Sequence, residues 1–124
     1  ITILPNELEL NKQIIQSIND LSHKFETIAV ICKTAAECSA VFEQLSHHVD
    51  IQLITHNTKQ FKKGILLLPA YMAKGIEFDA VLIYNASAAN YSRETERNYF
   101  YTACTRAMHE LHIYSINKLT YFLQ

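Results

Sequence analysis

Apolar residues follow two alternating patterns along the chain. Short runs that are apolar on both faces predict buried strands, at residues 1–4, 27–32, 51–55, 65–68, 80–84 and 111–114. Between these runs, apolar positions recur at helical spacing: Ile14, Ile18 and Leu21 lie on one predicted helix of about residues 7–24. Because strands and helices alternate, we expect a three-layer α/β domain with a mainly parallel sheet and helices on both of its faces.

The predicted helices begin at residues that can cap the free N–H groups of a first turn. Asn6 precedes the first helix, and Thr34 with Glu37 forms a capping box at the start of the second. Ser92 is followed by two acidic residues, which favour a helix start because they interact with the positive end of the helix dipole. Residues 118–123 predict a last helical turn or two.

The helix predicted after Ser92 carries Arg106. Its inward face is expected to hold the apolar residues Phe100, Ala103, Cys104, Ala107 and, at or beyond the helix end, Leu111. At about 100° per residue, Arg106 then lies about 120° from this face, on a flank shared with Tyr99 and Thr102. Such a position leaves the guanidinium available outside the core.

Length and composition limit the class of protein. The 124 residues suffice for one domain, residues 1–124, and Ile1 in place of methionine indicates a fragment of a longer chain. The formal net charge of -1 argues against a globally basic nucleic-acid binder, so any contact with a polyanion is expected to be local. Three cysteines at no metal-ligand spacing predict buried thiols in a reducing, cytoplasmic compartment. No membrane span, signal peptide or metal-ligand set is recognisable.

Candidate chemistry is concentrated in residues 73–84 and 101–107. Lys74, Gly75 and Glu77 follow a predicted strand, and open α/β sheets bind ligands at the carboxyl ends of their strands. Arg106 offers a planar, bidentate guanidinium, the group suited to phosphate. Ordinary structural roles compete with this interpretation: a surface arginine at 106, a loop ion pair between Glu77 and Lys74, and solvated lysines at 33, 59, 62 and 63.

Three segments, in this order, resemble motifs of superfamily 1 DNA helicases of the UvrD/Rep kind. Residues 73–81, AKGIEFDAV, resemble motif V, and residues 97–107, RNYFYTACTRA, resemble motif VI. Residues 28–45, IAVICKTAAECSAVFEQL, are similar to the motif IV region. Asp79 after the phenylalanine and the compact ending are most similar to the helicase IV branch. The resemblance implies a RecA-like fold of the P-loop NTPase type. It also implies that the chain is the second motor domain of such a helicase.

The resemblance also implies a role for each matching position. Arg106 is expected to reach the γ-phosphate of ATP as an arginine finger, worth roughly 10³–10⁵ in rate. Glu77 matches the residue that bonds the ribose, Gly75 lets the backbone approach the nucleotide, and Lys33 stands where many relatives carry a motif IV arginine. The nucleic-acid contacts are expected at Tyr71, Lys74 and Pro69, although relatives often have His and Thr at positions 71 and 69.

No phosphate-binding loop of the form Gly-x-x-x-x-Gly-Lys-Thr/Ser occurs in the sequence. We therefore expect the chain to supply half of a site for ATP with Mg²⁺, shared with the P-loop motor domain of the same parent chain. Single-stranded or partly duplex DNA is the expected partner, and the isolated chain is expected to have no ATPase activity. Two alternatives are a phosphometabolite-sensing module and a catalytically silent interaction domain.

Overall fold

The sheet of the computed structural model, which describes residues 1–123, has six strands in the order β1-β6-β5-β2-β4-β3. Every pairing between these strands is parallel. The strands are β1 (Thr2–Leu4), β2 (Thr27–Cys32), β3 (Ile51–Leu53), β4 (Gly64–Pro69), β5 (Phe78–Ile83) and β6 (Ala107–Ile116). The predicted parallel α/β architecture is confirmed, although β5 and β6 begin earlier than the apolar runs indicated.

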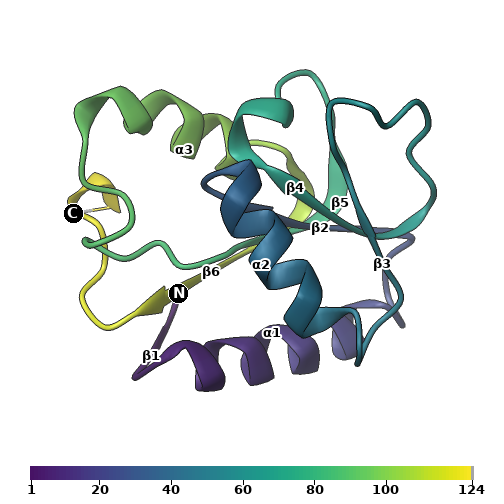
Figure 1. The fold of residues 1–124 in the computed structure, drawn as a ribbon, viewed down its shortest axis with the longest axis horizontal. Helices are drawn as coiled ribbons and strands as arrows, with labels where there is room; N and C mark the ends of the chain where they lie inside the picture. The colour runs from purple at the N-terminus through teal and green to yellow at the C-terminus, as the bar shows by residue number, and fades with distance from the viewer. Residues whose placement is uncertain (124) are drawn as a thin grey trace.

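Helices cover both faces of this sheet (Figure 1). On one face lie α1 (Glu7–Leu21) and α2 (Ala35–Leu45). On the other lie α3 (Arg97–Cys104) and the 3₁₀ turns η1 (Ala70–Met72) and η3 (Tyr121–Leu123), with the turn η2 (Glu94–Glu96) directly before α3. No helix formed by residues 1–123 combines the length and apolarity that a bilayer crossing requires.

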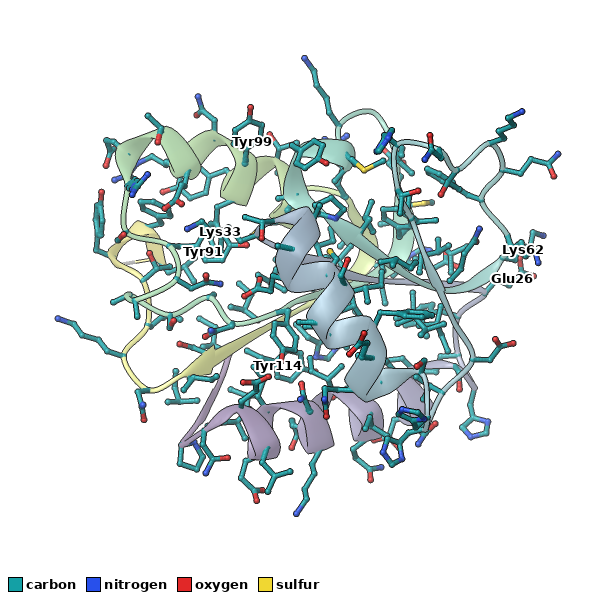
Figure 2. All side chains as sticks on the ribbon, in the orientation of Figure 1. Glu26, Lys33, Lys62, Tyr91, Tyr99 and Tyr114 are labelled. Atoms are coloured by element: carbon teal, nitrogen blue, oxygen red, sulfur yellow. The ribbon has the colours of Figure 1, made fainter. Side chains whose placement is uncertain are left out.

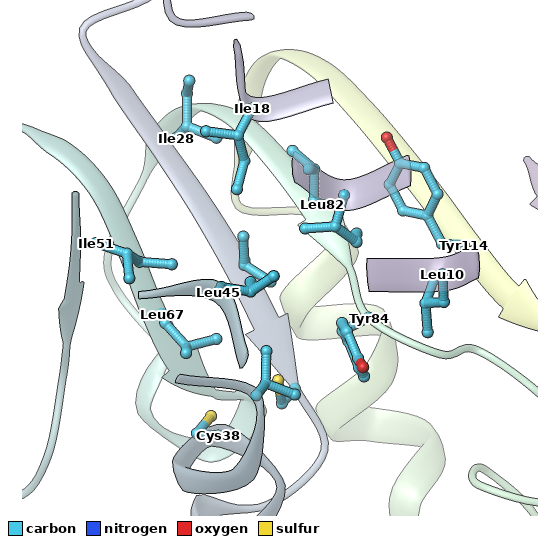
Figure 3. Close-up of a cluster of buried hydrophobic side chains, with 14 of the residues drawn as sticks. Leu10, Ile18, Ile28, Cys38, Leu45, Ile51, Leu67, Leu82, Tyr84 and Tyr114 are labelled. Carbon is cyan, nitrogen blue, oxygen red and sulfur yellow. The ribbon is translucent and has the colours of Figure 1, made fainter. Parts of the chain in front are cut away.

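Two apolar cores result from the alternation of side chains along the strands. In β2, Ile28 and Val30 face α1 and α2, whereas Ala29 and Ile31 face α3. Figure 3 shows the first core, in which side chains of α1 and α2 meet those of the sheet. Because the central strands are covered on both sides, their sequences are continuously apolar, which is why the periodicity identified them.

The two long helices begin where the sequence predicted. The Asn6 Oδ1 accepts the N–H of Glu9 at 2.9 Å, and the Thr34 Oγ1 accepts the N–H of Glu37 at 3.1 Å. The second half of the predicted capping box is wrong, because the Glu37 carboxylate accepts the N–H of Lys33 at 2.9 Å instead of returning to Thr34.

The third helix differs from its prediction at both ends. Ser92 does not cap it: the Glu96 Oε1 accepts the backbone N–H groups of Ser92 and Arg93, and α3 begins at Arg97. The helix ends at Cys104, so Ala107 and Leu111 belong to β6 and not to a helical face. The physical reason is that β5 offers a pairing partner, and the chain from Ala107 onward takes it.

Candidate nucleotide and nucleic-acid interface

The predicted site residues lie in two groups at opposite ends of the strands. Lys33 follows β2 and Tyr71 follows β4, and Cys32 pairs with Pro69, so this group lies at the carboxyl ends. The segment of residues 70–77 then runs to the start of β5, as a connection between parallel strands must. Glu77 and Arg106 therefore lie at the amino ends of β5 and β6, and the expectation that the motif loops gather at carboxyl ends is wrong for them.

Helix α3 connects these two groups on one face of the sheet. Its first turn is preceded by Glu96, which pairs with Lys33, and its last turn leads into Arg106. The turn η1 packs against α3, and Ala73, Phe78 and Phe100 share one buried core. One face thus presents the motif V segment and the motif VI segment next to each other.

Arg106 occupies the turn between α3 and β6, not a helical flank as the periodicity implied. Its Nε donates to the Thr102 carbonyl at 3.2 Å, and its Nη2 donates to the Thr105 Oγ1 at 3.1 Å. Its carbonyl oxygen accepts the N–H of Phe78 at 2.9 Å. The Nη1 has no hydrogen-bond partner among residues 1–123, so the guanidinium is oriented by the helix end and keeps N–H donors for a ligand.

Three residues of the segment before β5 are exposed to solvent: Lys74, Gly75 and Glu77. Gly75 has a φ of +81°, in the left-handed region that favours glycine, and nothing lies within 4 Å of where a side chain would begin. Lys74 and Glu77 are exposed and form no ion pair with each other. The alternative interpretation of these two residues as an ordinary loop ion pair is therefore wrong. Within the described part of the chain the Glu77 carboxylate has no hydrogen-bond partner, and it is therefore available to accept one from a ligand hydroxyl.

Lys33 is neither solvated nor free. Its ammonium forms an ion pair with the Glu96 Oε2, and the two side chains are only 28% and 14% exposed. Burial raises the pKa of Glu96, but hydrogen bonds from Lys33, Arg93 and Ser92 outweigh this effect, and the pKa is lowered. Contact between Lys33 and a phosphate therefore requires the ammonium to leave Glu96 or to bridge both anions.

The backbone at Lys33 is held by a second carboxylate. The Glu37 Oε1 accepts the Lys33 N–H, and the Glu37 Oε2 accepts the Asn90 Nδ2 at 3.2 Å. Burial raises the pKa of Glu37 even though these donors and the nearby Lys33 charge act in the opposite direction. Through these two hydrogen bonds, Glu37 holds the end of β2 next to the loop that follows β5, in which Asn90 lies.

A pocket of about 260 Å³ lies beside Lys33 at the carboxyl ends of β2 and β4. Its aromatic walls are Tyr71, Tyr91 and Tyr99, and its polar walls include Glu96. Figure 2 shows Lys33 and Tyr91 below α3, which carries Tyr99. Sequence reasoning missed Tyr91, Tyr99 and Glu96 as site residues, because only the pairing of β2 with β4 and the path of α3 bring them to Lys33 and Tyr71.

The other candidate chemistry is structural. The thiols of Cys32 and Cys38 are buried, and burial raises the pKa of Cys104 to about 11, so none is an activated nucleophile. Within residues 1–123, no three side chains of the His, Cys, Asp and Glu types are gathered as a metal ion requires.

Comparison with known proteins connects this geometry to a family. Residues 65–114 match the UvrD-like helicase C-terminal domain. The crystal structure of the C-terminal domain of a possible DNA helicase from Lactobacillus plantarum WCFS1 is 36% identical, with a TM-score of 0.87 over 98% of this chain and 76% of that one. No curated protein sequence is significantly similar.

Two DEAD-box proteins share the fold alone. The C-terminal domain of Dbp5 is 9% identical, with a TM-score of 0.64 over 91% of this chain and 74% of that one. Domain 2 of Mss116p, solved with an RNA duplex, is 12% identical, with a TM-score of 0.50 over 91% of this chain and 52% of that one. Together with the parallel six-stranded sheet, these matches identify the RecA-like fold of second helicase domains, and the chain belongs to the UvrD-like helicase C-terminal domain family.

Proposed function

We propose that the chain is the second motor domain of an ATP-dependent DNA helicase and supplies half of a site for ATP with Mg²⁺. The other half, with the phosphate-binding loop, belongs to a P-loop motor domain of the same protein. The proposal rests mainly on the hydrogen bond between the Phe78 N–H and the Arg106 carbonyl, which holds the Glu77 segment beside the arginine. A carboxylate with no hydrogen-bond partner among residues 1–123 and a guanidinium with free donors are thereby brought to the same end of β5 and β6.

Glu77 contacts the ribose in this proposal. An ionised carboxylate only accepts hydrogen bonds, and the hydroxyls of a ribose are donors of the matching kind. Gly75, with its positive φ and open surroundings, lets the backbone of the same segment approach the nucleotide. The segment thus binds the nucleoside part while the missing domain binds most of the phosphate.

Arg106 acts as the arginine finger. Charge on the transferred phosphoryl group is spread over its outer oxygens, and a positioned guanidinium stabilises this charge during transfer. The bonds to Thr102 and Thr105 hold Arg106 near the required place before the domains close. Closure on ATP then lets the free Nη1 donors meet the γ-phosphate, and opening after hydrolysis releases them.

Tyr71, Lys74 and Pro69 form part of the DNA track. Tyr71 is 52% exposed and is suited to stacking on an unpaired base, and Lys74 is an exposed cation for a phosphate. Pro69 is buried and lines a hollow beside Tyr71, where its role is to shape the surface. Lys33 lies at the opposite end of the strands from Glu77 and Arg106, and Glu96 holds its ammonium, so it does not contact the same nucleotide in this proposal.

The test uses the full-length helicase that contains this chain. Arg106→Ala should lower kcat of the DNA-stimulated ATPase by roughly 10³-fold or more, while the affinity for ATP changes much less. Arg106→Lys should restore the rate only in part, because an ammonium lacks the planar fork. The matched control is Arg93→Ala, which removes an exposed arginine outside the proposed site and should leave kcat unchanged. A rate for Arg106→Ala within about twofold of wild type would overturn the proposal and favour a catalytically silent interaction domain.

A further inference from the structure

Carboxylates are absent from one long stretch of the chain. No aspartate or glutamate occurs between Asp50 and Glu77, yet four of the eleven lysines and arginines do, which leaves seven basic residues against twelve acidic ones elsewhere. Three of these four lysines lie in residues 54–63, here named the β3–β4 loop because it joins those strands. We propose that the β3–β4 loop is a second contact for single-stranded DNA, separate from the motif residues. This inference rests on the proposed function and extends its DNA track.

The β3–β4 loop is held in place by the strand it leaves. The Gln52 Nε2 donates to the Gln60 carbonyl at 3.2 Å, and the Gln52 Oε1 accepts the N–H of Lys62 at 3.1 Å. At the other end, Thr55 and Thr58 form a turn closed by two hydrogen bonds of 2.9 Å. These bonds hold the backbone of the loop near both of its ends, which reduces the conformational entropy that is lost when a ligand binds.

Gln52 bonds the backbone on both sides of an exposed aromatic residue, Phe61, which lies between Lys59 and Lys62 in the sequence. Phe61 is 42% exposed, which leaves much of its ring to solvent. Lys59 and Lys62 are exposed and form no ion pair within residues 1–123. Lys63 pairs with Glu26 at 3.1 Å, but both groups are largely exposed and the pair contributes little. A solvated loop explains the lysines alone, whereas cations beside an exposed ring are the combination that binds unpaired bases and their phosphates.

A surface hollow joins the β3–β4 loop to Tyr71. The hollow of about 250 Å³ is lined by Thr55, His56 and Asn57 on one side and by Pro69 and Tyr71 on the other. In Figure 1 the loop forms the right-hand margin of the molecule beyond β3 and β4, and Figure 2 shows Lys62 at that margin. A strand that stacks on Tyr71 can therefore continue through the hollow toward the loop lysines and Phe61, which requires no base-specific hydrogen bonds.

The experiment measures the anisotropy of a labelled oligothymidylate of about 20 nucleotides, titrated with the chain between about 50 and 200 mM salt. The double variant Lys59→Gln/Lys62→Gln should weaken binding and make the negative slope of log affinity against log salt shallower by roughly 1.4, because each lost phosphate contact contributes about 0.7 to its magnitude. Phe61→Ala should weaken binding about fivefold or more with the slope unchanged, because stacking releases no counterions. The matched control Lys12→Gln/Lys118→Gln makes the same change in charge away from the loop and should change neither quantity.

Several outcomes would overturn the inference. They are an unchanged slope in the loop variant, an equal change in the control, or no binding by the wild-type chain at about 50 mM salt. An equal effect of Phe61→Ala on a duplex would do so too, because paired bases cannot stack on a side chain. If Tyr71→Ala weakens binding and the loop variants do not, the loop inference alone fails. If neither has an effect, the DNA track fails as well, while the ATPase test of Arg106 stays independent.

Discussion

The backbone N–H of Phe78 donates to the backbone carbonyl of Arg106 at 2.9 Å, and Phe78 pairs in register with Ala107. The motif V and motif VI segments are thus joined where the parallel pairing of β5 with β6 begins. The position of Glu77 relative to Arg106 is consequently set by the sheet and does not depend on a flexible loop.

Glu77→Ala in the full-length helicase should raise KM for ATP by about tenfold or more and change kcat much less. A hydrogen bond from a hydroxyl to a carboxylate contributes about 1.5–3 kcal/mol, and it is made before and during the chemical step alike. Steady-state ATPase assays with ATP and with 3′-deoxy-ATP provide the measurement. The variant should lose the preference for ATP, and a variant that keeps the full preference would exclude a contact between Glu77 and the ribose 3′-hydroxyl.

The isolated chain should hydrolyse ATP no faster than the buffer background, with or without single-stranded DNA. No phosphate-binding loop occurs in the sequence, and most phosphate donors belong to the partner domain in our proposal. A coupled ATPase assay on the purified chain tests this expectation. Turnover that copurifies with the chain and disappears in Arg106→Ala would contradict the shared site.

Lys33→Ala should destabilise the chain by about 1–2 kcal/mol, because it leaves the mostly buried Glu96 carboxylate without its cation. Glu96→Gln should also destabilise, since the pKa of Glu96 is lowered and its ionised form is the stabilising one. The double variant should cost less than the sum of the two. Urea unfolding of all four proteins gives the coupling free energy, and a value of zero would show that the pair does not hold α3.

Phe100→Ala should lower the free energy of unfolding by about 3–5 kcal/mol. The Phe100 ring is fully buried, meets Tyr91 edge to face at 5.0 Å between centroids, and lies 5.8 Å from Phe122. The matched control is the neighbouring Tyr99→Ala, whose ring is largely exposed and whose loss should cost well under about 1 kcal/mol. Similar urea midpoints for the two variants would contradict the assigned inward face of α3.

The stabilising effect of Glu94 should depend on pH. Hydrogen bonds from Arg97, and next from Tyr121, lower the pKa of Glu94 from 4.5 to about 2. Because the folded-state pKa is the lower one, the stabilisation is present above pH 4.5 and is lost as the pH falls toward 2. The difference in Tm between wild type and Glu94→Gln should therefore be largest above about pH 5 and shrink in acid. A difference that stays constant over this range would show that the carboxylate charge is irrelevant.

The sequence by itself determined the local structure and the chemical types at the site. Strands covered on both faces need continuous apolar runs, and helices with one buried side need apolar residues at helical spacing, so β2 and α1 are readable directly. Caps such as Asn6 act on an N–H three residues away, which is also a local relation. The motif residues Glu77 and Arg106 were recognisable from their neighbours in the chain.

Only the tertiary structure decided which of these residues meet. The end of α3 before Arg106 results from competition with β5 for the same backbone groups, and the helical period cannot reveal that competitor. The Lys33–Glu96 ion pair and the Glu37–Asn90 hydrogen bond join residues far apart in the sequence, and they exist because of the strand order. Pairings of this kind leave no periodic trace in a sequence, because their energies depend on distances that are set when the sheet assembles.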